Sequence, residues 1–152
     1  MRISAKADYA VRAAAELAAA PAGRPVKGDQ LAQAQAIPPK FLENILADLR
    51  NAGLVRSRRG VDGGYALTRA ADDISVADVM RAVGGPLAAV QGVRPEGLHY
   101  GGAASRLPEV WVALRANLRA VLERVTLADL AAGALPDGVT DLAAVADAWQ
   151  PH

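Results

Sequence analysis

The chain has 152 residues, of which 52% are hydrophobic but only 4% aromatic, and its formal net charge at pH 7 is +1. This length fits one domain or a small domain with an appended segment, and the absence of cysteine excludes disulfides, thiol nucleophiles and cysteine-ligated metal clusters. No apolar run approaches the roughly 18 residues of a membrane span, and the start of the chain lacks a signal peptide's apolar core, so we expect a cytoplasmic protein without a membrane partner.

Two helices are predicted in the first part of the chain. Ser4 can cap the first helix, which runs over residues 5–20 and stops at Pro21, because a serine oxygen accepts hydrogen bonds from the first helical N–H groups. A shorter helix is predicted from Val26 to Ala34, with Asp29 as its cap.

A third helix is predicted to begin at Pro38-Pro39, since proline is tolerated in the first helical turn, and to end at Gly53. Its apolar residues recur at intervals of three and four and predict one buried face, made of Phe41, Leu42, Ile45, Leu46 and Leu49. The opposite side is expected to face solvent and carries Lys40, Glu43, Asn44, Ala47 and Asn51.

The hydrophobic period then changes from that of a helix to that of strands. Residues 54–59 and 64–69 are short segments bounded by glycines, and an Asp-Gly pair in the loop between them is a strong hairpin signal. Ser75 begins a variant of the capping box, which opens a short helix ending at Gly84. The expected order is three helices, a hairpin and a fourth helix.

A long helix is predicted from Ser105, after an irregular glycine-rich segment at residues 90–104. Apolar residues spaced by four and three form the seam of a heptad pattern over almost three repeats: Leu107, Trp111, Leu114, Leu118, Val121 and Val125. The seam indicates either pairing with a second copy of the chain or packing on the protomer's own core, and we favour the first. Two short helices are expected to follow.

Three helices followed by a glycine-tipped hairpin make up a winged helix-turn-helix, so we expect a mainly α fold with a small β-hairpin wing. The third helix of such a fold presents residues near its amino end to base edges in the major groove. Glu43 can accept from the cytosine amino group, Asn44 can bond adenine, and Lys40 suits a phosphate or guanine. A solvated face without a partner is the alternative. The predicted DNA contacts on the helices are Lys27, Pro38, Pro39, Lys40, Glu43, Asn44 and Arg50.

The hairpin is predicted to make a second contact with DNA. Arg56 and Arg58 share one strand face, and Arg59 lies next to the tip, where the negative potential of a minor groove would hold an arginine. Because glycines let the backbone come close to the sugar–phosphate chain, the predicted contacts also include Gly60, Gly63 and Gly64.

A nucleotide-binding loop of an enzyme is the other use for such glycines. The Walker loop needs G-x-x-x-x-G-K-[ST], and a dinucleotide loop needs G-x-G-x-x-G opening a helix. Residues 60–64, GVDGG, satisfy neither pattern and lead into a strand. We therefore expect a protein that is not an enzyme and has no catalytic residues.

Charge is divided unevenly along the chain. Residues 1–70 carry 11 Lys/Arg and 6 Asp/Glu, a net charge of +5, whereas residues 71–152 carry 6 and 10, a net charge of −4. A basic first half suits a polyanionic partner, because charge neutralisation supplies most non-specific affinity for nucleic acids. Random unevenness of a solvated surface is the alternative.

Residues 41–85 resemble the signature of the Rrf-two family of bacterial winged-helix regulators. The family's pattern runs from aromatic-Leu-Glu through Gly-Leu-Val-x-Ser-x-Arg-Gly to Gly-Gly-Tyr-x-Leu and continues with a helix containing Asp-Val. The matching residues are Phe41, Leu42, Glu43, Leu49, Gly53, Leu54, Val55, Ser57, Arg59, Gly60, Gly63, Gly64, Tyr65, Leu67, Asp78 and Val79. The helix from Ser105 resembles the family's dimerisation helix.

The resemblance implies a homodimeric, sequence-specific DNA-binding transcriptional regulator, usually a repressor, acting on a pseudo-palindromic operator. In the family, the residues that match Glu43 and Arg59 take part in base or groove recognition. Asn44 stands where glutamine is common, while Pro38 and Lys40 stand where serine is frequent. Because of these departures, the resemblance does not predict the operator sequence, but it still implies the family's mode of DNA binding.

Family members that sense iron–sulfur clusters or nitric oxide hold the cluster through three cysteines in the loop before the long helix. This chain has no cysteine there, so we expect no iron–sulfur cluster, and its two histidines without acidic partners predict no metal site. Binding of a small-molecule effector is an open alternative, and His99, Tyr100 and Trp111 are the candidate residues of its pocket. Packing on the helix seam is the stronger alternative for Trp111.

The predicted organisation is a DNA-binding domain over residues 1–85, an irregular loop over 86–104 and a helical dimerisation region over 105–152. The alternative function is a winged-helix module for protein–protein assembly that has no operator of its own. The basic first half argues against this alternative.

Overall fold

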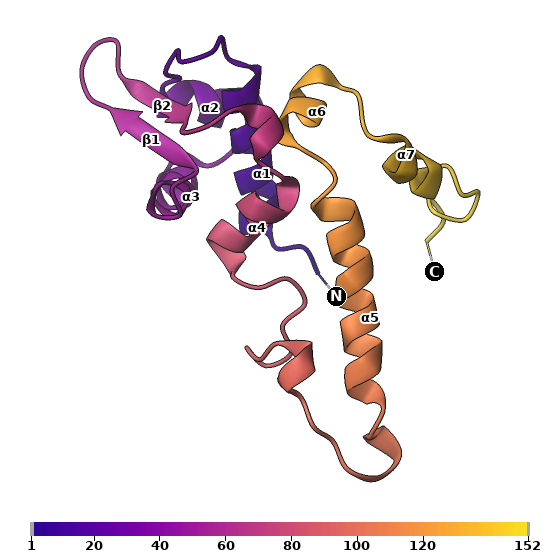
Figure 1. Cartoon of the computed structure of the whole chain (residues 1–152). Coiled ribbons are helices and arrows are strands. Elements are labelled where there is room, and N and C mark those ends of the chain that lie inside the picture. Colours follow the sequence, from indigo (N-terminus) through magenta and orange to yellow (C-terminus); the bar gives the residue numbers. More distant parts are fainter. Residues whose placement is uncertain (1, 152) are drawn as a thin grey trace.

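The computed structural model describes residues 2–151, which form helices and an antiparallel hairpin (Figure 1). The elements in chain order are α1 (Ala5–Ala19), α2 (Gly28–Gln35), α3 (Pro39–Asn51), β1 (Val55–Arg58), β2 (Gly64–Leu67), α4 (Val76–Gly84), α5 (Leu107–Leu122), α6 (Leu127–Ala132) and α7 (Asp137–Ala143). Short 3-10 turns lie at Ala71–Asp73 (η1), Pro95–Gly97 (η2) and Gly102–Ala104 (η3). The predicted mainly α fold with a small hairpin wing is confirmed.

The core is built around α1, which contacts α2, α3, α4 and α6. Ala10, Ala13 and Ala14 of α1 are almost completely buried, and their small side chains allow the surrounding helices to approach closely. The larger side chains that fill the core come from the elements around α1 and include Leu31, Ile37, Ile45, Leu46, Leu49, Ile74, Val79 and Leu127. This packing fixes α3 relative to the hairpin that follows it.

The ends of the helices follow from local side-chain hydrogen bonds. Ser4 Oγ accepts from the backbone N–H of Ala7 at 3.1 Å, as predicted, and Ser75 and Asp78 form the predicted capping box at the start of α4. The prediction of Asp29 as the cap of α2 is wrong. That helix begins after Lys27, whose backbone N–H donates to Gln30 Oε1 at 3.3 Å.

The chain after α5 returns to the core. The backbone N–H of Val76 donates to the carbonyl of Val125 at 2.9 Å, and Leu127, which is completely buried, donates its N–H to the carbonyl of Ile74 at 2.9 Å. Val125 is only 6% exposed and lies beyond the end of α5. Its predicted place on a seam of the long helix is therefore wrong, because it is part of the protomer's own core.

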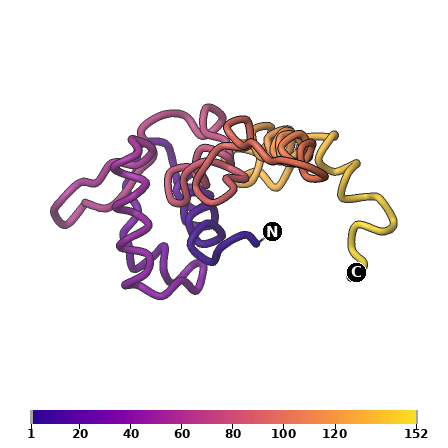
Figure 2. Tube along the Cα trace, turned by 90° about the horizontal axis from the view of Figure 1, so that it is seen from below, coloured from indigo at the N-terminus to yellow at the C-terminus, as the bar shows by residue number. Residues whose placement is uncertain are grey.

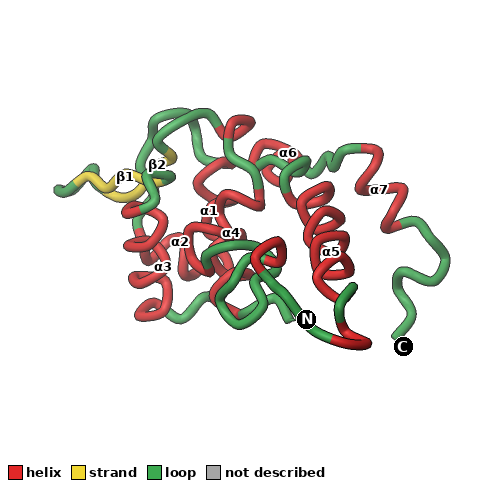
Figure 3. The backbone as a smooth tube through the Cα atoms, turned by 60° about the horizontal axis from the view of Figure 1, so that its bottom comes forward, coloured by secondary structure: helices red, strands yellow, loops and turns green. Residues whose placement is uncertain are grey.

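Different elements lie at the two ends of the molecule. The hairpin and α3 lie at one end, and α5 and α7 lie at the other, as both the side view and the view from below show (Figures 1 and 2). The hairpin extends outward from the helices, whereas α5 runs along the opposite side of the domain (Figure 3). Among residues 2–151, no helix is long and apolar enough to cross a membrane.

Candidate nucleic-acid interface

One face of α3 is anchored in the core, and the other is free. Leu42, Ile45, Leu46 and Leu49 are buried, whereas the residues predicted to face DNA at the amino end are all exposed: Pro38, Pro39, Lys40, Glu43 and Asn44. The helix is thus held in a fixed orientation by its apolar side while its first two turns present polar groups outward.

Phe41 departs from the predicted buried face. Its side chain is 40% exposed, and its ring packs edge-on against Tyr9 of α1, with the ring centroids 5.7 Å apart. Phe41 therefore covers the rim of the core where α3 meets α1. Arg12 stacks on the same Tyr9 ring, 5.2 Å from its centroid, and extends this rim.

The polar groups of α3 are only loosely engaged within the protomer. Lys40 Nζ lies 3.0 Å from Glu43 Oε2, but the two side chains are 89% and 64% exposed. An exposed ion pair of this kind contributes about 1 kcal/mol at most. Both groups can therefore exchange this contact for one with a nucleic acid at little energetic cost.

The hairpin carries a cluster of unpaired cations. Arg56, Arg58 and Arg59 are exposed, and none of their guanidinium groups forms an ion pair within residues 2–151. Between residues 49 and 71 the sequence has five arginines but a single acidic residue, Asp62. The field at this end of the molecule therefore attracts anions.

The strands fix how these arginines are presented. Val55 pairs with Leu67 and Arg58 with Gly64 in the antiparallel register. Tyr65 exchanges two backbone hydrogen bonds of 2.8 Å with Val26, which lies two residues before the start of α2. The hairpin is thus attached to the helical core through β2, while β1 carries Arg56 and Arg58 on one face and Arg59 follows the end of the strand.

The glycines of the hairpin build the turn. Gly63 is buried, its N–H donates to the carbonyl of Gly60 at 3.0 Å, and a Cβ at this position would lie 2.3 Å from the carbonyl oxygen of Arg58. Gly64 has φ +144°, and a Cβ there would lie 2.5 Å from the carbonyl oxygen of Val26. Gly63 was predicted as a DNA contact, but its burial leaves no surface for one, and only Gly60 of the three is exposed.

Two further predicted contacts border the same surface. Lys27 is exposed just before α2. Arg50 is exposed near the end of α3, and its Nη1 lies 3.5 Å from Ser57 Oγ of β1, at the edge of hydrogen-bond distance. Arg50 therefore lies where the charge of α3 continues onto the hairpin.

The apolar side of the long helix is only partly covered within the described residues. No residue of α5 is buried within residues 2–151. Along the predicted seam Leu107, Trp111, Leu118 and Val121 are half-buried, and Leu114 is 37% exposed. Trp111 also has a buried indole Nε1 with no hydrogen-bond partner among the described residues.

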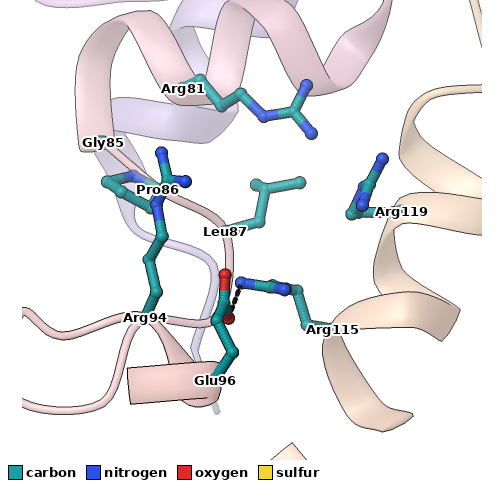
Figure 4. A pocket seen from close by; sticks show the side chains of 8 residues that line it. All are labelled: Arg81, Gly85, Pro86, Leu87, Arg94, Glu96, Arg115 and Arg119. Carbon is teal, nitrogen blue, oxygen red and sulfur yellow. Dashed lines mark ion pairs between the residues drawn. The ribbon is translucent and has the colours of Figure 1, made fainter. Parts of the chain in front are cut away.

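The predicted effector pocket of His99, Tyr100 and Trp111 is not the cavity found beside α5. That cavity has a volume of about 480 Å³ and is lined by four arginines: Arg81, Arg94, Arg115 and Arg119 (Figure 4). None of the three predicted residues lines it, and His99 and Tyr100 are exposed. The sequence does not predict this cluster of arginines, because they are spread over 39 residues and three segments of the chain.

Comparison with known proteins assigns the family. Residues 3–133 match the model of the Rrf2 (Rrf-two) family, described as iron-dependent transcriptional regulators. The chain belongs to the Rrf2 family. Its family and relatives are transcriptional regulators, which are not enzymes, and the chain is a DNA-binding regulator of this type.

Relatives and solved structures agree with the Rrf2 assignment. A proposed HTH-type transcriptional regulator of Mycobacterium tuberculosis H37Rv is 55% identical over 143 residues, covering 94% of this chain and 89% of the relative. CymR of Bacillus subtilis is 36% identical over 131 residues, covering 86% and 90%. The structure of CymR superimposes with a TM-score of 0.73 over 88% of this chain and 98% of that one. The structure of T. potens IscR gives a TM-score of 0.71 at 32% identity, covering 88% of each chain.

The side chains of this Rrf2 protein do not fit a cysteine-held iron centre. The sequence contains no cysteine, and residues 2–151 include no group of three or more His, Cys, Asp or Glu side chains that could hold a metal ion. In the loop before α5, Glu96 is engaged by Arg115, with Nη1 2.5 Å from Oε2. The side chains in this loop that could bind a metal are therefore Glu96, which is held in a salt bridge, and the exposed His99.

Proposed function

We propose that this Rrf2 protein is a homodimeric repressor that binds a pseudo-palindromic operator and works without an iron–sulfur cluster. One observation carries the proposal: the polar amino-terminal face of α3 is exposed beside a hairpin whose arginines form no ion pair within residues 2–151. A core-anchored helix next to an exposed cationic wing matches what a DNA groove and its flanking phosphates require.

Each side chain has a role that follows from its chemistry. Glu43 accepts a hydrogen bond from a cytosine amino group, and Asn44 bonds an adenine, so both select bases in the major groove. Arg59 enters the minor groove, whose negative potential holds a guanidinium. Lys40 contacts a phosphate or guanine, and the remaining cations neutralise backbone phosphates and position the protein: Lys27, Arg50, Arg56 and Arg58.

The dimer is proposed to form through α5. No residue of α5 is fully buried within residues 2–151, and Leu107, Trp111, Leu114 and Leu118 recur at the spacing of a helix-pairing seam. Two copies related by a two-fold axis would place their α3 helices in successive major grooves, about 34–36 Å apart. Repression follows when such a dimer occupies DNA that RNA polymerase needs.

The absence of cysteine supports regulation by a signal other than a bound cluster. The signal would then be read by groups that this chain has, such as the arginines near α5.

The experiment is footprinting and gel shift of the protein on its own promoter region at fixed, moderate salt. We expect protection of a two-fold symmetric site, and specific affinity reduced roughly 5- to 150-fold in Glu43→Ala and Arg59→Ala, because each lost base or groove contact is worth about 1–3 kcal/mol.

Glu109→Ala is the matched control for Glu43→Ala. Both glutamates are 64% exposed and lie in an i,i+3 ion pair with a cation, but Glu109 is on α5, away from the wing. Wild-type binding no tighter than to random duplex would overturn the regulator and favour protein–protein assembly. Equal losses in Glu43→Ala and Glu109→Ala would overturn the assignment of α3 as the recognition helix.

A further inference from the structure

The arginine cavity lies between α4 with its following loop on one side and α5, the proposed dimer helix, on the other. Arg81 comes from α4, Arg94 from the loop that follows it, and Arg115 and Arg119 from α5. Their side chains surround a space of about 480 Å³ whose apolar side is formed by Pro86 and Leu87 (Figure 4). Such a volume is within the usual range of small-molecule sites, roughly 300–1,000 Å³.

Positive charge around this cavity is incompletely balanced. Glu96 is the only carboxylate among the lining residues and is occupied by Arg115. Arg119 Nε lies 2.9 Å from Glu123 Oε1, and Arg81 shares the same oxygen. Arg94 forms no ion pair with any residue between 2 and 151. Cations gathered around a shared space repel one another, and an anion between them relieves that repulsion.

We propose that this cavity binds a small organic molecule carrying at least two carboxylate or phosphate groups. A guanidinium presents a planar fork of donors that binds either group through two parallel hydrogen bonds. Arg94 is free to bind one anionic group, and Arg115 and Arg119 on the facing helix can bind a second. Pro86 and Leu87 leave room for the carbon skeleton between them.

Occupancy of the cavity is coupled to the position of α5. Arg81 connects α4 to Glu123 at the end of α5, and Arg115 of α5 connects to Glu96 of the loop. An anionic ligand that binds the guanidinium groups of Arg81 and Arg115 competes with the carboxylates of Glu123 and Glu96. It therefore weakens the ion pairs that hold α5 against α4 and the loop. Because α5 is also the proposed dimer helix, this ligand alters the spacing of the two α3 helices. This regulatory consequence rests on the proposed function; the binding itself does not.

Isothermal titration of the full chain with citrate and with inorganic pyrophosphate tests the site without DNA. Choline chloride at matched ionic strength accounts for screening. We expect saturable binding of at least one probe, weakened about tenfold or more in Arg94→Gln, since a hydrogen bond to a charged group contributes about 1.5–3 kcal/mol. Arg94 has no ion pair among the described residues, so its replacement breaks no salt bridge of that part of the fold.

Arg24→Gln, in the turn between α1 and α2, is the matched control, because Arg24 is exposed and also has no ion pair within the described residues. It should bind the probes as the wild type does. No saturable binding, or binding lost in Arg24→Gln and kept in Arg94→Gln, would overturn the site. An unchanged thermal melting temperature without ligand would show that Arg94→Gln is folded.

A second arm separates this site from the proposed function. The probe that binds is added to gel shifts of wild type and Arg94→Gln, and we expect it to change operator affinity only in the wild type. An equal response of both proteins would overturn the coupling. If the probe binds in titration but the wild type has no specific operator, the proposed function fails while the anion site stands.

Discussion

The region from α1 to α4 and the helix α5 differ in how far their apolar side chains are buried within the protomer. In the first, Ala10, Ala13 and Ile45 have no exposed surface at all, whereas no residue of α5 is buried. Yet α3 in the first region and α5 are both amphipathic helices with apolar residues at intervals of three and four. The difference teaches that periodicity specifies an apolar side, and that the partner for that side can be inside the chain or outside it.

The largest expected effect lies in the first region. Leu49→Ala should lower the free energy of unfolding by about 2–5 kcal/mol, because Leu49 is completely buried and the truncation leaves a cavity between α3 and α1. Val110→Ala on α5, where the residue is 55% exposed, should change it by less than about 0.5 kcal/mol. Urea unfolding at one fixed protein concentration measures both. Equal losses would remove the contrast between the two regions.

The next effect tests whether the partner of α5 is a second copy. Leu114→Glu places a charge in the proposed seam and should weaken the dimer by about tenfold or more, as measured by sedimentation equilibrium, because an unpaired charge is costly to bury. Operator affinity should fall with it. Ala116→Glu, on the opposite side of α5 and also exposed, is the control. A wild type that is monomeric at all accessible concentrations would contradict the proposal.

A smaller effect is expected where the hairpin meets the core. Gly64→Ala forces a Cβ to within 2.5 Å of the carbonyl oxygen of Val26 at a φ of +144°, which should cost about 1–3 kcal/mol of stability and displace the wing. Gly84→Ala at the end of α4 meets no atom within 4 Å and should be nearly neutral. Thermal unfolding measures stability, and gel shift measures the accompanying loss of DNA affinity. A fully stable Gly64→Ala would show that the wing is not held through Val26.

The sequence predicts the first region well because its constraints are local. Ser4 and Ser75 cap helices through residues three positions away, and the glycines of the wing act on their own backbone. The cap of α2 is a local exception, because the helix begins after Lys27 and not at Asp29. The failure at the end of α5 is long-range. Val125 continues the heptad spacing, but the antiparallel bridge between Ser75 and Thr126 turns it into the core.

The candidate sites divide in the same way. The exposed side of α3 and the arginines of the wing follow from helix and strand periodicity within 22 residues, from Pro38 to Arg59. The cavity beside α5 depends on how a loop of irregular backbone places Arg94 between two helices. No spacing rule connects Arg81 to Arg115, so only the fold brings them together.

The smallest effect concerns the ion pairs that join the two regions. Hydrogen bonds from Arg119 and then Arg81 lower the pKa of Glu123 below its ordinary value of 4.5, and hydrogen bonds from its own backbone and from Arg115 lower that of Glu96. A carboxyl whose pKa is lower in the folded state stabilises the fold above pH 4.5, and this contribution is lost as the pH falls through the folded pKa.

Glu123→Gln should therefore be slightly less stable than the wild type near pH 7, with a shallower loss of stability from pH 5 to pH 3. Unfolding free energies measured across this range test the expectation. The effect is small because Glu123 is exposed and water screens its charge. Identical pH profiles would show that Glu123 does not hold α5 to α4, and the contact between the two regions would then rest on apolar packing and on the chain's return at Val125.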